Sequence, residues 1–387
     1  MNREHLATKL VKGSGEAAAA APLTTPIYST TTFVFESAED VRRYQEGKSQ
    51  KYLYSRYENP TVVEVEARIA ALDSAERGLL FSAGMAAVAT TMMALVKAGD
   101  EVVCGAAVYG GTAHLLQDVL SDFSVTTRFV SLKELHAQEG LFGPRTRIVW
   151  FESPVNPTLR CVDVRRIAQA CRSAGVSSVI DNTFATAVNQ QPLALGVTLV
   201  VQSVTKYLNG HSDVTGGAVT GDRALVERIS KTRRLLGTVM DPAAAYNLGR
   251  GLKTLLVRMD RHNTNALALA RALEQDGRIP RVYYPGLESH PDHGLAKAQM
   301  SGFSGMLAID LGTYEGASRV FDRLRVIRRA ASLGGVESLA SLPVLTTHWG
   351  HSPEQLAAAG IRPGTLRISV GLEDVGDLIE DVKQALG

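Results

Sequence analysis

Short apolar runs alternate with amphipathic stretches along most of the chain. Between the runs, apolar residues recur three or four positions apart, which is the spacing of a helix that buries one face. Strand and helix in alternation predict an α/β fold with a mainly parallel sheet covered by helices on both faces. The runs short enough for buried strands are 79–81, 101–104, 125–130, 147–151, 177–180 and 197–201.

The first regular helix is predicted to begin after Asn59 and to end at about Ala75. Asn59 can cap a helix, Pro60 suits its first turn, and apolar residues recur at helical spacing from 62 to 72. The stretch 79–96 is the most membrane-like, but one serine, one glycine and two threonines interrupt it. It is therefore predicted to be a strand that leads into a buried helix.

The pattern divides the chain into three parts. Residues 1–50 are predicted to be an arm, 51–249 one α/β domain and 250–387 a smaller C-terminal α/β domain. Residues 241–273 indicate a helix that is broken or bent at some point along its length. The C-terminal part is predicted to hold strands at 306–311 and 366–370 and helices at 316–325 and 374–386.

Composition narrows the class of protein. The 387 residues are 45% hydrophobic and 21% charged, and 41 basic against 39 acidic residues leave a net charge of +2. This balance gives no support to a nucleic-acid or membrane partner. The three cysteines lack metal-ligand spacing, so we expect free thiols in a reducing cytoplasm and no metal site. The alanines at 17–21 are too few for the apolar core of a signal peptide.

Polar residues follow several of the predicted strands, at the sheet edge where α/β proteins bind ligands. Small residues around Gly84 and Met85 suit either a plain turn or a helix start that offers free amides to a phosphate. Asp181 is either a helix cap or a buried carboxylate that needs a partner. The segment 152–157 is either a rigid loop or a part of the site.

A lysine follows the last of these strands. Lys206 is either solvated or held beside a phosphate, an arrangement that the hydroxyls of Ser203 and Thr205 and the glycines at 210, 216 and 217 would suit. A phosphate cradle, a lysine nucleophile and a strand-end aspartate together are the parts of a pyridoxal phosphate site.

On these residues the chain resembles the cystathionine γ-synthase family of Cys/Met-metabolism enzymes, among the fold-type I pyridoxal phosphate proteins. The resemblance runs from about residue 20 to the C-terminus, and its most specific motif is Ser203-Val-Thr-Lys-Tyr-Leu-Asn-Gly-His-Ser-Asp213. It implies pyridoxal 5'-phosphate as cofactor and a seven-stranded, mainly parallel sheet in the larger domain. Residues 51–249 would then be the cofactor-binding domain.

The resemblance also implies a role for individual residues. Lys206 would bind the cofactor covalently and move protons between substrate carbons, and Tyr109 would stack on the ring as a second catalytic residue. The remaining cofactor ligands implied within the same chain are Gly84, Met85, Asp181, Thr183, Ser203 and Thr205.

Two further groups complete the implied site. Tyr54 and Arg56 resemble a pair that reaches the phosphate of a neighbouring subunit, which implies a homo-oligomer, a tetramer built from dimers that share active sites. Asn156, Ser332 and Arg367 resemble the groups that bind the substrate carboxylate. An arginine suits this task because its planar fork makes two parallel hydrogen bonds to a carboxylate.

The chain departs from its relatives at two informative positions. Ala331 stands where many γ-lyases and bacterial γ-synthases of the family carry a glutamate, and Gly111 stands where methionine γ-lyases typically carry a cysteine. A Lys-Asp pair of methionine γ-lyases appears as Arg233 and Arg234, although the stretch 258–262 is similar to theirs. A dedicated methionine γ-lyase is thus disfavoured.

The resemblance predicts an enzyme of trans-sulfuration or methionine biosynthesis that acts on small amino acids. The expected reaction is γ-replacement on an O-acylated homoserine with cysteine, which gives cystathionine. The alternatives are γ- or β-elimination from cystathionine or a related sulfur amino acid, and sulfhydrylation of the O-acylhomoserine. A catalytically silent cofactor-binding scaffold is disfavoured because the lysine, aspartate and arginine are all present.

Overall fold

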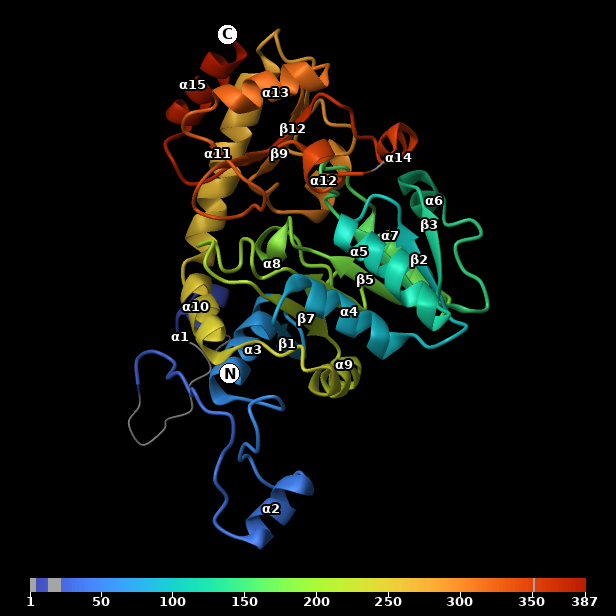
Figure 1. The fold of residues 1–387 in the computed structure, drawn as a ribbon, viewed down its shortest axis with the longest axis vertical. Helices are drawn as coiled ribbons and strands as arrows, with labels where there is room; N and C mark the ends of the chain where they lie inside the picture. Colours follow the sequence, from blue (N-terminus) through green and yellow to red (C-terminus); the bar gives the residue numbers. More distant parts are fainter. Residues whose placement is uncertain (1–4, 13–21, 351) are drawn as a thin grey trace.

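The computed structural model describes residues 5–12, 22–350 and 352–387. The alanine run at 17–21 and the remainder of the arm before residue 22 lie outside the described residues. Within the described arm, helices α1 (Leu6–Lys12) and α2 (Ala38–Gln45) are present, and α2 projects away from the other elements (Figure 1).

A seven-stranded sheet forms the centre of the larger part of the molecule, in the order β1-β7-β6-β5-β4-β2-β3. All of its strands except β7 run in the same direction. This confirms the predicted mainly parallel sheet. The strands are β1 (Arg77–Phe81), β2 (Glu101–Gly105), β3 (Thr126–Val130), β4 (Thr146–Glu152), β5 (Ser177–Asp181), β6 (Leu199–Gln202) and β7 (Gly217–Gly221).

Side chains on the two faces of the sheet pack into different cores. Trp150 and Phe151 are adjacent and fully buried, and they belong to two separate apolar clusters on opposite faces. The helices and helical turns of this part are α3 (Pro60–Leu72), α4 (Gly84–Leu95), α5 (Gly110–His114), η1 (Leu115–Val119), η2 (Leu120–Phe123), α6 (Leu132–Ala137), α7 (Val164–Ser173), α8 (Thr186–Asn189), α9 (Arg223–Leu236) and α10 (Pro242–Leu252).

Strand β7 was not among the predicted runs. Its sequence, Gly-Ala-Val-Thr-Gly, is short and framed by glycines. A Cβ on Gly217 would lie 2.8 Å from the Cβ of Ala87, so the glycine allows α4 to pack on the strand. This packing explains Gly217 better than the phosphate contact that the sequence suggested.

A second sheet occupies the C-terminal part, in the order β10-β11-β12-β9-β8 (Figure 1). The structure confirms the predicted strands at β9 and β12 and the predicted helices at α13 and α15, whereas β8, β10 and β11 were missed. The elements are α11 (Leu255–Glu274), β8 (Arg281–Tyr283), α12 (His293–Gln299), β9 (Met306–Asp310), α13 (Tyr314–Arg323), β10 (Arg328–Arg329), β11 (Leu339–Ser341), η3 (Pro343–Leu345), α14 (Pro353–Ala358), β12 (Thr365–Ser369) and α15 (Val375–Leu386).

The long helical segment is broken, as predicted, between α10 and α11. The domain boundary placed between residues 249 and 250 stays a prediction and falls inside α10. Helix α3 ends at Leu72, with Asp73 as its C-cap, rather than near Ala75. Among the described residues, no helix combines the length and the apolar character needed to cross a membrane.

Candidate active site

Lys206 lies just beyond β6, where the chain turns back from the sheet edge. Its Nζ donates a hydrogen bond to Oγ of Ser332, 2.7 Å away in the C-terminal part of the chain. Burial, with the nearby positive charge of Arg367, lowers the pKa of Lys206 to about 8. An amine with this pKa is ready to exchange protons near neutral pH.

Ser332 links the lysine to the predicted carboxylate anchor. Arg367, on β12, donates from Nη2 to the Ser332 carbonyl (3.1 Å) and from Nη1 to Oδ1 of Asn156 (3.0 Å). Only 4% of Arg367 is exposed, and burial lowers the pKa of its guanidinium to about 10. Ser332 itself has φ +88°, a strained backbone angle for a residue with a side chain. The structure thus brings Lys206, Ser332, Asn156 and Arg367 together.

Asp181 ends β5 and faces a second carboxylate. One of its oxygens accepts a hydrogen bond from the backbone N–H of Thr183 (2.9 Å), and its register partner on β4 is Glu152. Burial raises the pKa of both carboxyls, and the negative charge of Asp181 raises the pKa of Glu152 further. Neither makes an ion pair with a basic side chain of the described residues, so a cationic ring nitrogen would fit beside Asp181.

The segments predicted to hold a phosphate also lie next to one another. Helix α4 begins at Gly84, and no side chain caps its first turn. A Cβ on Gly84 would lie 3.0 Å from Oγ of Ser203, which is a tight contact, so the glycine eases the close approach of the two segments. The backbone N–H of Ser203 donates to Oγ1 of Thr183 (2.8 Å), and Oγ1 of Thr205 accepts from the Gly216 N–H (2.9 Å).

Tyr109 begins α5 beside this cradle, with 45% of its surface exposed. Glu152 accepts a hydrogen bond from its backbone N–H (2.6 Å). A Cβ on Gly111 would lie 2.6 Å from the Tyr109 ring and 3.0 Å from Sδ of Met85. The Tyr109 ring and Met85 therefore converge on one point, where a side chain at position 111 has no room in this conformation.

Tyr54 and Arg56 lie apart from these residues. Arg56 donates from Nη1 to the carbonyl of Arg234 (2.7 Å), and its guanidinium lies over the rings of Tyr57 (4.9 Å) and Tyr54 (5.5 Å). Both line a separate pocket of about 460 Å³ that contains none of the other predicted site residues. One chain therefore gathers all the predicted site residues except this pair.

Glu152 is the member of the site that the sequence analysis missed. The sequence analysis leaves the segment 152–157 as either a rigid loop or a part of the site and gives Glu152 no role, although Glu152 ends a buried strand as Asp181 does. Only 7% of Glu152 is exposed. The usable signal was an acidic residue that closes an otherwise apolar run, because such a residue needs a partner at the sheet edge.

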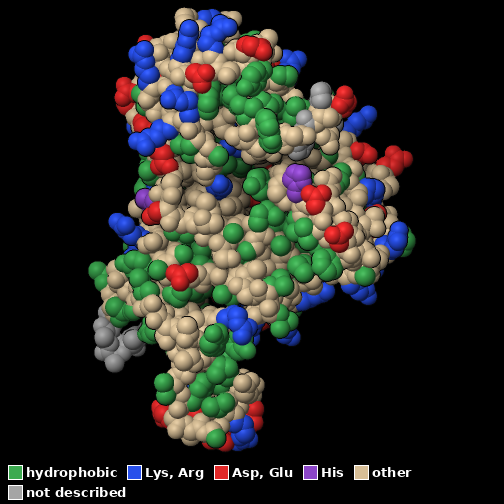
Figure 2. All heavy atoms as spheres, viewed as in Figure 1, with side chains coloured by type: hydrophobic (Ala, Val, Ile, Leu, Met, Phe, Trp, Pro, Cys, Tyr) green, Lys and Arg blue, Asp and Glu red, His purple; other side chains and the backbone are tan. Residues whose placement is uncertain are grey.

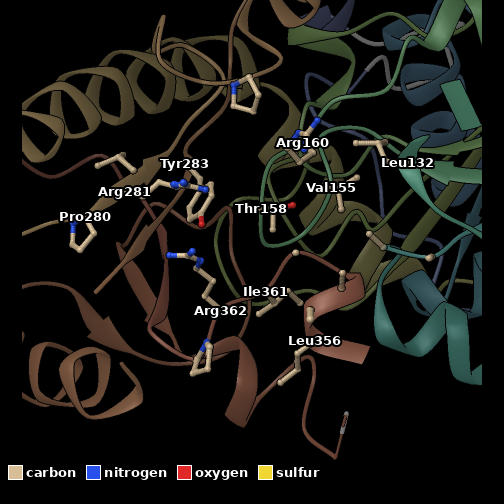
Figure 3. A pocket seen from close by; sticks show the side chains of 18 of the residues that line it. Leu132, Val155, Thr158, Arg160, Pro280, Arg281, Tyr283, Leu356, Ile361 and Arg362 are labelled. Atoms are coloured by element: carbon tan, nitrogen blue, oxygen red, sulfur yellow. The ribbon is translucent and has the colours of Figure 1, made fainter. Parts of the chain in front are cut away.

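A cavity of about 1090 Å³ lies next to the cluster, between the large sheet and the C-terminal part (Figure 3). Val155 and Thr158 on one wall flank Asn156, but none of the predicted site residues lines the cavity. Its Arg362 pairs with the buried Asp310 (2.8 Å). The site is therefore defined by the hydrogen bonds around Lys206 rather than by this cavity.

The residues present fit pyridoxal phosphate. An uncapped helix start beside a serine and a threonine suits the phosphate, and the buried carboxylate of Asp181 suits the ring nitrogen. Lys206, whose pKa is lowered by burial, is close enough to both Asp181 and Arg367 for their charges to act on it.

Comparison with known proteins agrees with this geometry. A family model described as Cys/Met metabolism PLP-dependent enzyme matches residues 7–387, and the chain belongs to this family. A crystal structure titled as metB from Corynebacterium glutamicum has a TM-score of 0.92 and 36% sequence identity, and the match covers 99% of this chain and 98% of that chain. The fold is therefore that of a fold-type I pyridoxal phosphate enzyme.

Three curated relatives illustrate the range of activities. L-methionine γ-lyase of Pseudomonas putida is 43% identical over 94% of this chain and 92% of its own length. Cystathionine γ-lyase of Rattus norvegicus is 43% identical over 93% and 89%, and the chloroplastic cystathionine γ-synthase 1 of Nicotiana tabacum is 37% identical over 94% and 68%. The chain is thus similar to enzymes that eliminate and to one that is named as a synthase. These names leave the expected γ-replacement unconfirmed and give the elimination alternative more support.

Proposed function

We propose that this protein is a γ-lyase that removes a sulfur substituent from Cγ of an L-amino acid. The observation that carries the proposal is the pair of hydrogen bonds through Ser332, which holds the amine of Lys206 with its hydroxyl and the guanidinium of Arg367 with its carbonyl. An amino acid anchored at Arg367 by its carboxylate would present Cα to Lys206. The two lyases at 43% identity support elimination over the replacement that the sequence analysis favoured.

Binding of the cofactor is assigned to residues of the same cluster. Gly84, Met85, Ser203 and Thr205 would hold the phosphate, and Asp181, oriented by Thr183, would pair with the ring nitrogen. Tyr109 would stack on the ring, with its backbone fixed by Glu152. Pyridoxal phosphate supplies an electron sink for the negative charge that develops at the substrate carbon.

The chain's own groups would then move the protons. Lys206 would accept a proton from Cα and give it up before it accepts a second proton from Cβ, while Arg367 and Asn156 keep the carboxylate in place. The leaving sulfur takes up one proton and Cγ takes up the other. The bond between Cγ and sulfur breaks, and the sulfur leaves as a thiol. One water is consumed overall, and the remaining carbon skeleton is released as a 2-oxo acid with ammonia.

Replacement of the γ-substituent by a thiol is the second candidate. It uses the same residues and differs only when cysteine or another thiol adds to Cγ before release. Gly111 favours it, because methionine γ-lyases typically carry a cysteine at this position. Ala331 does not separate the two reactions, because bacterial γ-synthases of the family carry a glutamate there as many γ-lyases do. The O-acylhomoserine sulfhydrylase reaction is a variant with sulfide as the nucleophile.

A second copy of the chain is proposed to complete the site with Tyr54 and Arg56. The arm that leads to this pair exposes apolar side chains, among them Leu23 (97% exposed) and Val34 (90%). Figure 2 shows hydrophobic side chains along the projecting part of the molecule. The shared-site dimer, the tetramer and the cytoplasmic location stay predictions.

One assay panel tests the proposal. L-methionine, L-cystathionine and the O-acetyl, O-succinyl and O-phospho esters of homoserine would each be supplied with and without cysteine. We expect 2-oxobutanoate and ammonia in equal amounts from a sulfur amino acid without cysteine. Cystathionine formed from an ester with cysteine, together with no 2-oxobutanoate from any sulfur amino acid, would establish replacement instead.

A further inference from the structure

Helix α11 buries an arginine that has no acidic partner among the described residues. Arg258 is 4% exposed and directs all its hydrogen bonds at uncharged oxygens. Nη1 donates to the carbonyl of Tyr207 (2.7 Å), Nη2 to those of Gly251 (2.9 Å) and Leu208 (3.3 Å), and Nε to Oγ1 of Thr254 (3.1 Å). A buried charge is costly unless it is fully hydrogen-bonded, so this contact set is specific and not incidental.

The carbonyls that Arg258 binds belong to the turn that carries Lys206. Tyr207 and Leu208 directly follow the lysine, and the turn closes with a hydrogen bond from Gly210 N–H to the Lys206 carbonyl (2.8 Å). Gly210 has φ +74°, and a Cβ there would overlap the Arg258 guanidinium. The backbone that directly follows Lys206 therefore surrounds this guanidinium, which also links it to the end of α10 at Gly251.

One helical turn further along α11, His262 contacts both halves of the site. Its Nδ1 lies 2.7 Å from the carbonyl of Val370, the residue directly after β12, which carries Arg367. Its ring packs edge-on against the ring of Tyr207, with centroids 5.1 Å apart. His262 is fully buried, and burial lowers its pKa to about 4, so the ring is neutral and donates to the carbonyl through Nδ1–H.

We infer that Arg258 and His262 are positioning residues that set the spacing between Lys206 and Arg367 from a single rigid helix. Arg258 fixes the carbonyls of the two residues that directly follow the lysine, and His262 fixes the end of the strand that carries the arginine. This rests on the proposed function, because it assumes that Lys206 moves protons and that Arg367 anchors the substrate. Neither residue reaches the reacting atoms, so both act through the groups that they hold.

The test measures proton transfer at Cα alone. L-norvaline has no γ-leaving group, so the enzyme can exchange its Cα proton with deuterium from D₂O without further reaction, and proton NMR follows the loss of signal. The rate is expressed per cofactor-loaded site, with loading measured from cofactor absorbance. Wild-type exchange that disappears in Lys206→Ala supports the proposed role of the lysine, and exchange that persists there contradicts the proposed function itself.

Arg258→Met is expected to slow exchange about 10- to 100-fold at saturating norvaline, since a small displacement of a catalytic group lowers the rate by about this factor. The norvaline concentration that gives the half-maximal rate should change by less than about threefold. Arg258→Lys retains the charge and a donor and should recover part of the loss. His262→Leu should instead raise the half-maximal concentration, by about tenfold, because it frees the strand of Arg367. His262→Asn, which keeps a donor near Nδ1, should restore it.

Arg261→Met is the matched control, an exposed arginine on the same helix, and should behave as wild type. Equal per-site exchange in Arg258→Met and wild type would overturn the positioning role, as would a loss that disappears once the rate is corrected for cofactor loading. If Arg258→Met does not fold, Arg258→Lys decides, and a per-site rate equal to wild type overturns the inference.

Discussion

Two arginines that the sequence predicts to bind anions are treated differently by the fold. Arg367 is buried and fixed by hydrogen bonds to Asn156 and Ser332. Arg56 is exposed, donates to a backbone carbonyl and stacks on tyrosine rings. The first lies in a cluster that one chain assembles, whereas the second lies outside it.

The difference follows from where the chain places each residue. Asn156 follows β4, and Lys206 follows β6, so the parallel sheet brings them to one edge. Arg56 belongs to the segment before α3 and is free to face outward with the exposed apolar arm. One chain therefore supplies the lysine and the carboxylate anchor, and we expect a second copy to supply the arm.

Of the residues that one chain brings together, Lys206 should cause the largest loss of activity when it is replaced. We expect Lys206→Ala to lower kcat by about 10⁴-fold or more, because covalent binding and proton transfer are lost together. Borohydride reduction followed by mass spectrometry should find covalent cofactor in wild type and none in the variant. Covalent cofactor in Lys206→Ala would place the attachment at another lysine.

Arg367→Lys should weaken binding of the substrate carboxylate while the residues around Lys206 and Asp181 stay in place. Loss of one partner of a buried charge pair costs about 2–5 kcal/mol, so kcat/KM should fall about 30-fold to several thousand-fold. Lysine keeps the charge but lacks the planar two-point contact, so cofactor absorbance should be retained. Unchanged kcat/KM in a folded, loaded variant would reopen the search for the anchor.

The arm can be tested by mixing two inactive variants, Arg56→Ala and Lys206→Ala. If Arg56 acts in the partner's site, each hybrid dimer has one intact site, and random exchange of equal amounts should restore about a quarter of wild-type activity. If Arg56 acts within its own chain, the hybrid has no intact site. Subunit exchange would be demonstrated separately with differently tagged chains.

Much of the large sheet and of the site around Lys206 can be predicted from the sequence, because the end of a strand is a local feature of the sequence. Apolar runs locate the strands, and a parallel sheet then brings Asp181 and Lys206 to one edge, whatever their separation along the chain. Strand β7 was not predicted because it carries glycines, which allow α4 to pack closely, in place of the usual β-branched residues. Strands β8, β10 and β11 escaped because they are only two or three residues long.

Residues whose partners are distant and uncharged could not be predicted. Glu152 bonds the backbone of Tyr109, 43 positions away, and Arg258 bonds backbone carbonyls about 50 positions away. Backbone groups carry no sequence signal, so only the fold reveals such pairs. Asp73, a buried carboxylate outside the site, accepts hydrogen bonds from the side chains of Gln202 and Thr220, which are uncharged and 129 and 147 positions away, so the sequence does not indicate this group either.

Asp73 is buried but lies outside the site, so a substitution there tests the effect of burial on stability without an effect on catalysis. Its expected effect is the smallest of these predictions. Burial raises the pKa of Asp73 to about 6 from the ordinary 3.8, so the folded protein holds its proton more tightly than the unfolded chain. The stabilisation by this proton is complete below about pH 4 and is lost as the pH rises through 6. Above pH 7 the ionised carboxylate therefore destabilises the fold.

Asp73→Asn should consequently stabilise the protein at pH 7.5, by about 1–3 kcal/mol or a few degrees in Tm, and much less at pH 4. Oε1 of Gln202 has no hydrogen-bond partner among the described residues, so rotation of that amide lets it accept from the amide introduced at position 73. Asp310→Asn is the control, since that buried carboxylate pairs with Arg362 and its loss should lower Tm at pH 7.5. Calorimetry of the cofactor-loaded proteins at both pH values measures these changes in Tm. If the Tm of Asp73→Asn at pH 7.5 is equal to or below that of wild type, Gln202 and Thr220 stabilise the ionised carboxylate enough to offset its burial.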